Sequence, residues 1–119
     1  MPPTERTIYM NNTKREVAER LKDFFSRNRD YAVELDLKDI QTHTNIGTFS
    51  ITMNRECSYE DDLLSLSWKN NECIYEAFKI RYDDVSAIHE EQDEFGIQTM
   101  FVYMKYGILI EFGCVGIRL

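Results

Sequence analysis

Three cysteines and two histidines are the side chains whose chemistry could support nucleophilic catalysis. The cysteines are Cys57, Cys73 and Cys114, and the histidines are His43 and His89. A catalytic cysteine needs a neighbouring base and a further group that orients this base. None of the three lies in a recognisable nucleophile motif, and Cys73 and Cys114 fall in or beside apolar runs typical of strands. The pattern therefore favours small buried side chains over a catalytic thiol.

Two short segments carry the residue types that bind metals. His89-Glu90-Glu91 places three possible ligands in a row, but neighbouring residues of a strand point to opposite faces. A zinc site usually needs about four converging nitrogen or sulfur ligands. Asp83-Asp84 and Glu90 to Glu94 offer oxygen ligands for a harder cation, yet the spacing of a calcium-binding loop is missing. We therefore expect no metal and no other cofactor.

A metal-dependent nuclease centre is a separate possibility, because Glu76-Ala77-Phe78-Lys79 follows Asp61 and Asp62. A separation of three residues puts the Glu and Lys side chains on opposite faces of a strand, so they could not share one metal-bound water. The glycines form no phosphate-binding motif. We expect a protein that is not an enzyme. A small hydrolase or nuclease built around His43, His89 or the acidic residues is the least favoured alternative.

Acidic and tyrosine side chains are frequent in the second half of the chain. Residues 60–94 hold eleven acidic and three basic side chains. A charged run of this kind usually forms a solvated face. Tyrosines beside carboxylates also suit a protein interface, because they are large and rigid and have a polar tip. We assign to a partner-binding surface the residues Asp61, Asp62, Tyr82, Asp83, Asp84, Glu90, Glu91, Asp93, Glu94, Tyr103 and Tyr106.

One helix must position part of this surface. Thr13-Lys14-Arg15-Glu16 has the spacing of a capping box, in which the Thr hydroxyl accepts a hydrogen bond from the amide three residues later. The apolar residues that follow recur with the helical period and form one stripe. The pattern predicts an amphipathic helix that ends near residues 27–29. The apolar stripe consists of Val17, Ala18, Leu21, Phe24 and Phe25.

After Asp30 the apolar residues alternate with polar ones, which predicts strands with one wet face. Such runs cover residues 31–37, 49–53, 64–68, 73–80, 99–104 and 108–112. Polar breaks at 43–45, 70–71 and 105–107 have turn chemistry. We expect residues 83–94 to hold a short strand or turn. The fold class that follows is α+β, with one N-terminal amphipathic helix packed on an antiparallel sheet of about five to six strands.

The chain has the size of one domain. Its 119 residues leave no room for a second core, and 43% of them are hydrophobic. We expect residues 1–12 to form a loosely ordered leader and residues 13–119 to form a single α+β domain. No apolar run is long enough to span a bilayer, so no membrane association is expected. An odd number of widely spaced cysteines favours a reducing, cytoplasmic location.

Charge is distributed unevenly along the sequence. Residues 1–29 carry seven basic and four acidic side chains, whereas residues 30–119 carry seven and seventeen, which gives a formal net charge of −7. An acidic body repels phosphate backbones, so direct binding of nucleic acid is not expected. A basic protein surface is the better partner. The chain is therefore interpreted as a non-enzymatic acidic binding protein, an inhibitor or adaptor that docks on a basic, nucleic-acid-handling protein.

In size, charge and lack of catalytic motifs, the chain resembles inhibitors encoded by phages and mobile elements that mimic nucleic acid, including anti-CRISPR proteins. The resemblance is one of composition, and it implies a macromolecular target whose Lys/Arg groove the acidic surface would occupy. The alternative from a different functional class is a structural subunit that associates with copies of itself through exposed strand edges.

Overall fold

The computed structural model describes residues 6–8, 13–52, 55–71 and 74–118. Within these ranges the chain forms one α-helix, one short 3-10 helix and nine strands. Their order is β1 (Arg6–Ile8), α1 (Lys14–Arg27), β2 (Tyr31–Asp39), β3 (Asn45–Ile51), β4 (Arg55–Tyr59), β5 (Leu63–Asn71), β6 (Ile74–Arg81), η1 (Tyr82–Asp84), β7 (Val85–Gln92), β8 (Gln98–Met104) and β9 (Ile108–Arg118). None of the described helices is both long and apolar enough to cross a bilayer.

Helix α1 begins and ends where its sequence predicts. The Thr13 hydroxyl accepts a hydrogen bond from the Glu16 amide at 3.2 Å, which satisfies one of the free N–H groups of the first turn. At the other end, the Asn28 amide nitrogens of backbone and side chain both donate to the Phe24 carbonyl. The buried residues of the helix are Val17, Leu21, Phe24 and Phe25. The predicted amphipathic helix is confirmed.

The larger sheet has six antiparallel strands in the order β1-β7-β8-β9-β2-β3. Its longest pairing is that of β2 with β9, which joins the two halves of the chain from Tyr31↔Arg118 to Asp39↔Ile108. Alternate residues of each central strand are buried on the same side, as Val33 and Leu35 are in β2 and Met100 and Val102 in β8. This side is the inner face of the sheet.

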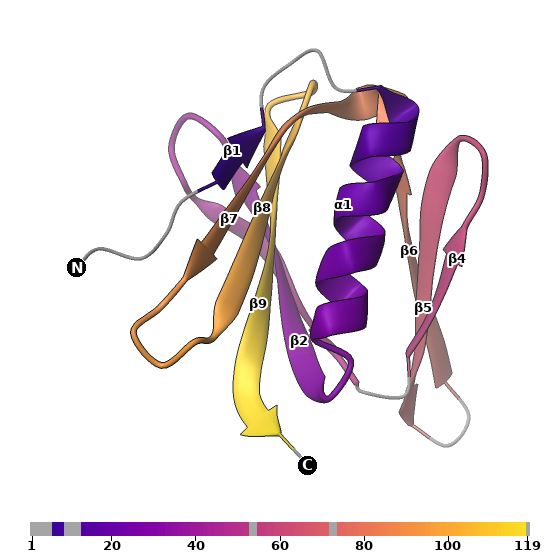
Figure 1. Cartoon of the computed structure of the whole chain (residues 1–119), viewed down its shortest axis with the longest axis vertical. Coiled ribbons are helices and arrows are strands. Elements are labelled where there is room, and N and C mark those ends of the chain that lie inside the picture. Colours follow the sequence, from indigo (N-terminus) through magenta and orange to yellow (C-terminus); the bar gives the residue numbers. More distant parts are fainter. Residues whose placement is uncertain (1–5, 9–12, 53–54, 72–73, 119) are drawn as a thin grey trace.

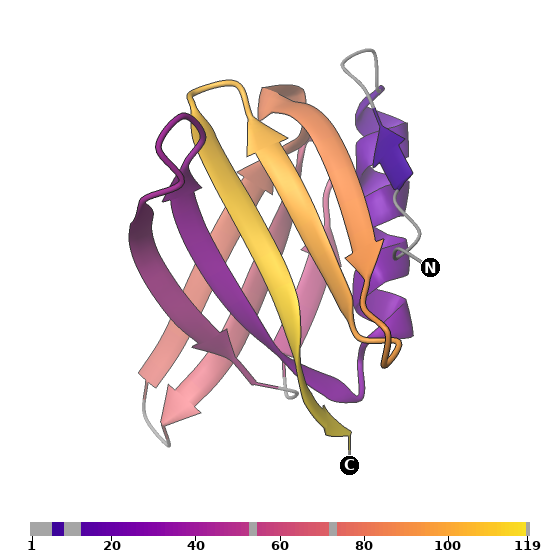
Figure 2. The ribbon, with the colours of Figure 1, turned by 90° about the vertical axis from the view of Figure 1, so that its left-hand side faces the viewer.

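The second sheet is smaller and consists of β4, β5 and β6 in that order. Leu64, Leu66 and Trp68 of β5 are buried and point to the same core as the helix. Together, α1 and this sheet cover the inner face of the six-stranded sheet (Figures 1 and 2). The helix lies over the half that contains β7 and β8, and the small sheet lies over the half that contains β2 and β3. One hydrophobic core fills the space between the two layers.

The predicted α+β class is thus confirmed, with the N-terminal helix packed on an antiparallel sheet. The structure adds a division into two sheets, which alternation alone does not reveal. It also contains strands where none, or only a short one, was expected. The half-buried residues of β4 do not form a regular apolar alternation. A bulge between Val85 and Ala87 interrupts the two-residue alternation of β7. Within the expected leader, Arg6–Ile8 forms β1 against β7.

Substitution of a core residue of α1 tests how strongly the helix holds the two sheets together. Leu21 is fully buried in the core. We expect Leu21→Ala to lower the free energy of unfolding by about 2–5 kcal/mol, because methyl groups are lost and a cavity forms. Urea unfolding followed by the fluorescence of Trp68, the single and buried tryptophan, measures the loss. Exposed Lys22→Ala is the control and should stay within about 0.5 kcal/mol of the parent.

Candidate functional site

The fold divides the predicted acidic surface into separate groups. Asp61 and Asp62 lie in the turn between β4 and β5, and Asp83 lies in η1. Lys14 at the start of α1 joins them, with its Nζ 2.8 Å from Asp62 Oδ1 and 3.3 Å from Asp83 Oδ2. The hydrogen bond and the charge of Lys14 lower the pKa of Asp62. Asp62 and Asp83 therefore belong to an ion-paired cluster at the helix N-terminus, and Asp61 is exposed next to Asp62.

The two tyrosines at this end of the molecule differ in exposure. Tyr82 is 2% exposed and packs in the core, and burial raises the pKa of its phenol. It is therefore not available at the surface that the sequence suggested. Tyr106 is exposed in the turn between β8 and β9. A hydrogen bond to the carboxylate of half-buried Asp84 raises the pKa of Tyr106, so the two side chains form one polar pair.

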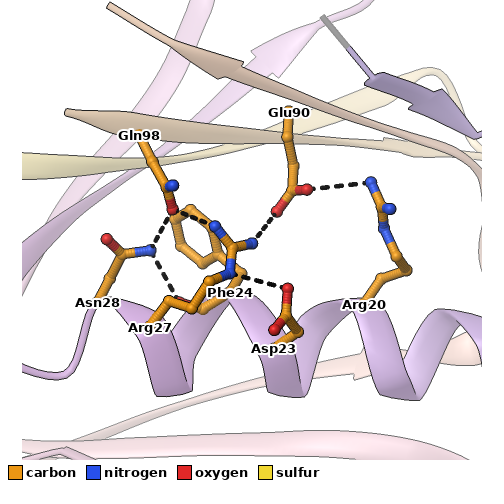
Figure 3. A network of polar contacts seen from close by, with 7 residues as sticks. All are labelled: Arg20, Asp23, Phe24, Arg27, Asn28, Glu90 and Gln98. Carbon is orange, nitrogen blue, oxygen red and sulfur yellow. Dashed lines mark hydrogen bonds and ion pairs between the residues drawn. The ribbon is translucent and has the colours of Figure 1, made fainter. Parts of the chain in front are cut away.

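Glu90 joins a network of polar contacts between β7 and α1 (Figure 3). Its two carboxylate oxygens accept hydrogen bonds from Arg20 at 3.0 Å and from Arg27 at 2.7 Å. The Glu90 side chain is 16% exposed and that of Arg20 is 24% exposed. Arg27 also donates to Asp23 and Gln98, and Asn28 donates to Gln98 at 3.0 Å. Glu90 thus ties the helix to the sheet and does not present a free charge to a partner.

The remaining acidic residues of this segment lie beyond Glu90. Glu91 points to the opposite face of the sheet, where its carboxylate lies 3.0 Å from His89 Nε2. Asp93 and Glu94 lie in the hairpin between β7 and β8, and Asp93 Oδ1 accepts hydrogen bonds from the amides of Phe95 and Ile97. Strand β7 separates this hairpin from the Lys14 cluster by about 25 Å. The predicted string is therefore not one continuous surface.

A continuous polar surface does exist on the outer face of the six-stranded sheet. In Figure 2 this face is turned to the viewer, and no other described element lies in front of it. The register aligns two cross-strand rows on it. One row contains Ala87, Tyr103, Leu109, Lys38 and Asn45, and the next contains His89, Phe101, Glu111, Asp36 and Thr48. The His89 and Phe101 rings pack with centroids 5.5 Å apart, and Leu109 is buried although it lies outside the main core.

Four carboxylates lie on the same face as these aromatic rings. Glu91 and Tyr103 belong to the predicted set, whereas Glu34, Asp36 and Glu111 were not assigned to it. Asp36 Oδ1 accepts a hydrogen bond from the Thr48 hydroxyl at 2.7 Å, and Glu111 forms an ion pair with Lys38. Strand alternation already indicated that Glu34 and Asp36 lie on a wet face. The missing information was the register, which brings β2 beside β9.

A hollow of about 250 Å³ opens in the middle of this outer face. It arises at Gly113, which lies between Thr99 of β8 and Glu34 of β2 and has no side chain to fill the space. A Cβ atom placed there would meet only Thr99 Oγ1, at 4.0 Å. Carboxylates of Glu34, Asp36 and Glu111 line the hollow. The geometry suits a long basic side chain from a partner, because its charge would meet carboxylates on more than one side.

The residues considered for catalysis do not converge. His43 lies in the turn between β2 and β3 with a positive φ of 58°, and His89 lies on β7, four strands away in the sheet. Burial raises the pKa of the Cys114 thiol to about 11, and it also raises the pKa of Cys57. Both thiols are therefore protonated near neutral pH. Cys73 lies outside the described residues. The described residues include no group of three side chains placed to hold a metal ion.

Comparison with known proteins gives no match. No family model matches the chain, and neither a curated protein nor a solved structure matches it significantly. From here on, the outer face is defined by the carboxylates Glu34, Asp36, Glu91 and Glu111 together with Phe101 and Tyr103.

Neutralising Glu90 tests its assignment to the fold. We expect Glu90→Gln to lower the free energy of unfolding by about 1–3 kcal/mol, because two partly buried guanidinium groups lose their shared carboxylate. Chemical unfolding measures the change. Glu94→Gln, which removes the same charge from the exposed hairpin, should change stability by less than about 0.5 kcal/mol. Equal stability of the two variants would contradict the structural role of Glu90.

Proposed function

We propose that this chain is a non-enzymatic binding protein that docks on a basic protein through its outer sheet face. The observation that supports the proposal is the uncovered face itself, which carries four carboxylates, Phe101, Tyr103 and a hollow that three of the carboxylates line. Aromatic side chains at the centre of a polar patch are typical of protein interfaces. The pairing of β strands on both sides holds these side chains at fixed spacing, which lowers the entropy cost of association.

The charge of the outer face favours a protein partner over nucleic acid. The described side chains of the outer face include four carboxylates and one lysine. This lysine, Lys38, is paired with Glu111. Burial raises the pKa of Tyr103, and the charges of Glu91 and Glu111 raise it further. Its phenol therefore stays neutral and can donate a hydrogen bond. Phosphates would be repelled by this surface, whereas Lys and Arg side chains would be attracted.

A basic surface of this kind is common on proteins that handle nucleic acid, because Lys and Arg neutralise phosphates there. Carboxylates at every second position of a strand lie about 7 Å apart, as Glu34 and Asp36 do. Such a row can occupy a groove that normally holds a phosphate backbone. We therefore propose an inhibitor or adaptor that competes with nucleic acid for its partner, in the manner of inhibitors encoded by phages and mobile elements.

The first experiment compares the parent with a Glu34→Gln, Asp36→Asn, Glu91→Gln variant. Both proteins are immobilised and exposed to host lysate at low salt, and captured proteins are quantified by mass spectrometry. We expect the parent to retain a basic, nucleic-acid-processing protein that elutes as salt rises and that added DNA or RNA displaces. The variant should retain at least about tenfold less of it.

A matched variant distinguishes the effect of where charge is removed from the effect of the change in net charge. Asp61→Asn, Glu56→Gln, Glu94→Gln removes the same charge from exposed sites away from the outer face. It should capture the partner as well as the parent does. Gly113→Val fills the hollow without changing charge and should also weaken capture. Equal loss in the matched variant, or full capture by the outer-face variant, would contradict the proposal.

A second candidate function, self-association, is favoured by one observation. Strand β3 is an edge of the six-stranded sheet and contains no charged residue. Ile46 is 58% exposed and Phe49 is 38% exposed on this strand. Edge strands are usually protected by charges, prolines or strong bulges, because their free backbone groups can pair with another chain. Two β3 strands could pair antiparallel about a two-fold axis.

Light scattering after size-exclusion chromatography tests this second candidate. If β3 mediates association, the measured mass rises toward that of a dimer as concentration increases, and Ile46→Lys restores the monomer because it places a charge on each edge. Val115→Lys changes an exposed apolar residue elsewhere and should leave the mass unchanged. A monomer at every concentration would exclude association through β3.

A further inference from the structure

A groove between helix α1 and strand β4 lies apart from the outer face. It has a volume of about 250 Å³ and is lined by Phe25, Ser26, Arg29, Arg55, Cys57 and Tyr59. We propose that this groove binds an extended peptide segment that alternates apolar and acidic residues and pairs with β4 as an added strand. This inference is independent of the outer face, because it concerns the other layer of the molecule.

The backbone of β4 is available for such pairing. Within the described part of the chain, β4 is the first strand of the small sheet and pairs only with β5. In an antiparallel pair, alternate residues direct their N–H and C=O groups away from the partner strand. On β4 these groups lie on the edge away from β5, and the groove shared with α1 lies beside this strand. Added strands use such groups for affinity and use side-chain pockets for specificity.

The groove supplies pockets for the apolar residues of the segment. Arg55, Cys57 and Tyr59 are half-buried on β4, and Glu56 and Ser58 are exposed. On the helix side, the Phe25 ring forms the wall, with the Arg55 guanidinium 5.7 Å from its centroid. Arg55 donates hydrogen bonds to the carbonyls of Asn28 and Tyr31, both at 2.8 Å, which closes the groove at the end of the helix.

Charge decides which kind of segment fits. The two flanks of α1 differ: Arg20 and Arg27 are paired with Glu90 on the β7 side. On the β4 side, Lys22 and Arg29 are exposed, and no described residue forms an ion pair with either. Arg29 lies two residues beyond the end of α1 and lines the groove, and Lys22 lies on α1 one turn before Ser26, which also lines it. Every second side chain of an added strand would point out toward these cations, so acidic residues there are favoured.

Selection from a displayed library of short random peptides on the immobilised full chain tests the proposal. Enriched peptides are synthesised with a fluorophore, and their binding is measured by anisotropy. We expect alternating apolar and acidic sequences, and we expect Lys22→Glu with Arg29→Glu to weaken their binding roughly tenfold. Lys79→Glu with Lys105→Glu changes the net charge equally at exposed sites elsewhere and should alter binding by less than about twofold.

Methylation of the peptide backbone then tests strand pairing. Blocking alternate amides should abolish binding in one register and leave it unchanged in the other, because only every second amide of an added strand faces β4. Equal binding of the two sets of methylated peptides would overturn the proposal. So would failure to enrich any sequence, or enrichment of peptides that bind the Lys22/Arg29 variant as well as the parent. Loss of binding in the outer-face variant would place the peptides there and would equally overturn it.

Discussion

The packing of α1 and the small sheet on one face of the six-stranded sheet is the constraint on which the rest of the structure depends. The buried residues of the helix and those of β5 belong to one core together with inner-face residues of β2, β8 and β9. Burial of this apolar surface is the main stabilising term. Since both elements lie on the same side, strand alternation sends every second residue of the central strands to an outer face left to solvent.

The same alternation explains why the acidic residues have different roles. Glu90 occupies an inner-face position opposite Met100, where a lone carboxylate would be strongly disfavoured. It is accommodated because Arg20 and Arg27 reach it from the helix (Figure 3). Glu91 is one residue later and lies on the outer face. Two neighbouring glutamates in the sequence thus contribute to structure and to surface charge respectively.

How much the sequence predicts can be seen from particular elements. The capping box and stripe of α1, and the alternation in β2, β5 and β8, were sufficient because each buries its apolar residues in the regular period of its element. Strand β4 was missed because its inward residues are Arg55, Cys57 and Tyr59, which do not have an apolar pattern. Strand β7 was underestimated because of its bulge and because Glu90 points inward. The outer face could not be assembled from sequence, because it depends on the pairing of β2 with β9 across the whole chain.

The distribution of ion pairs bears on the choice between a foreign partner and a second copy of the chain. A second copy would have to offer cations to the outer face, but Arg20, Arg27, Lys14 and Lys38 are all paired within the molecule. Lys22 and Arg29 on the groove side of the molecule are exposed cations outside these pairs, and a head-to-tail contact in which they meet the four carboxylates would give a ring or a filament and not a two-fold dimer. Pairing of two copies through the uncharged β3 edge needs no cations, but this edge contributes nothing to the electrostatic attraction of a partner. Electrostatic attraction at long range therefore favours a foreign basic protein for the outer face, because two copies of a chain with a formal net charge of −7 repel each other.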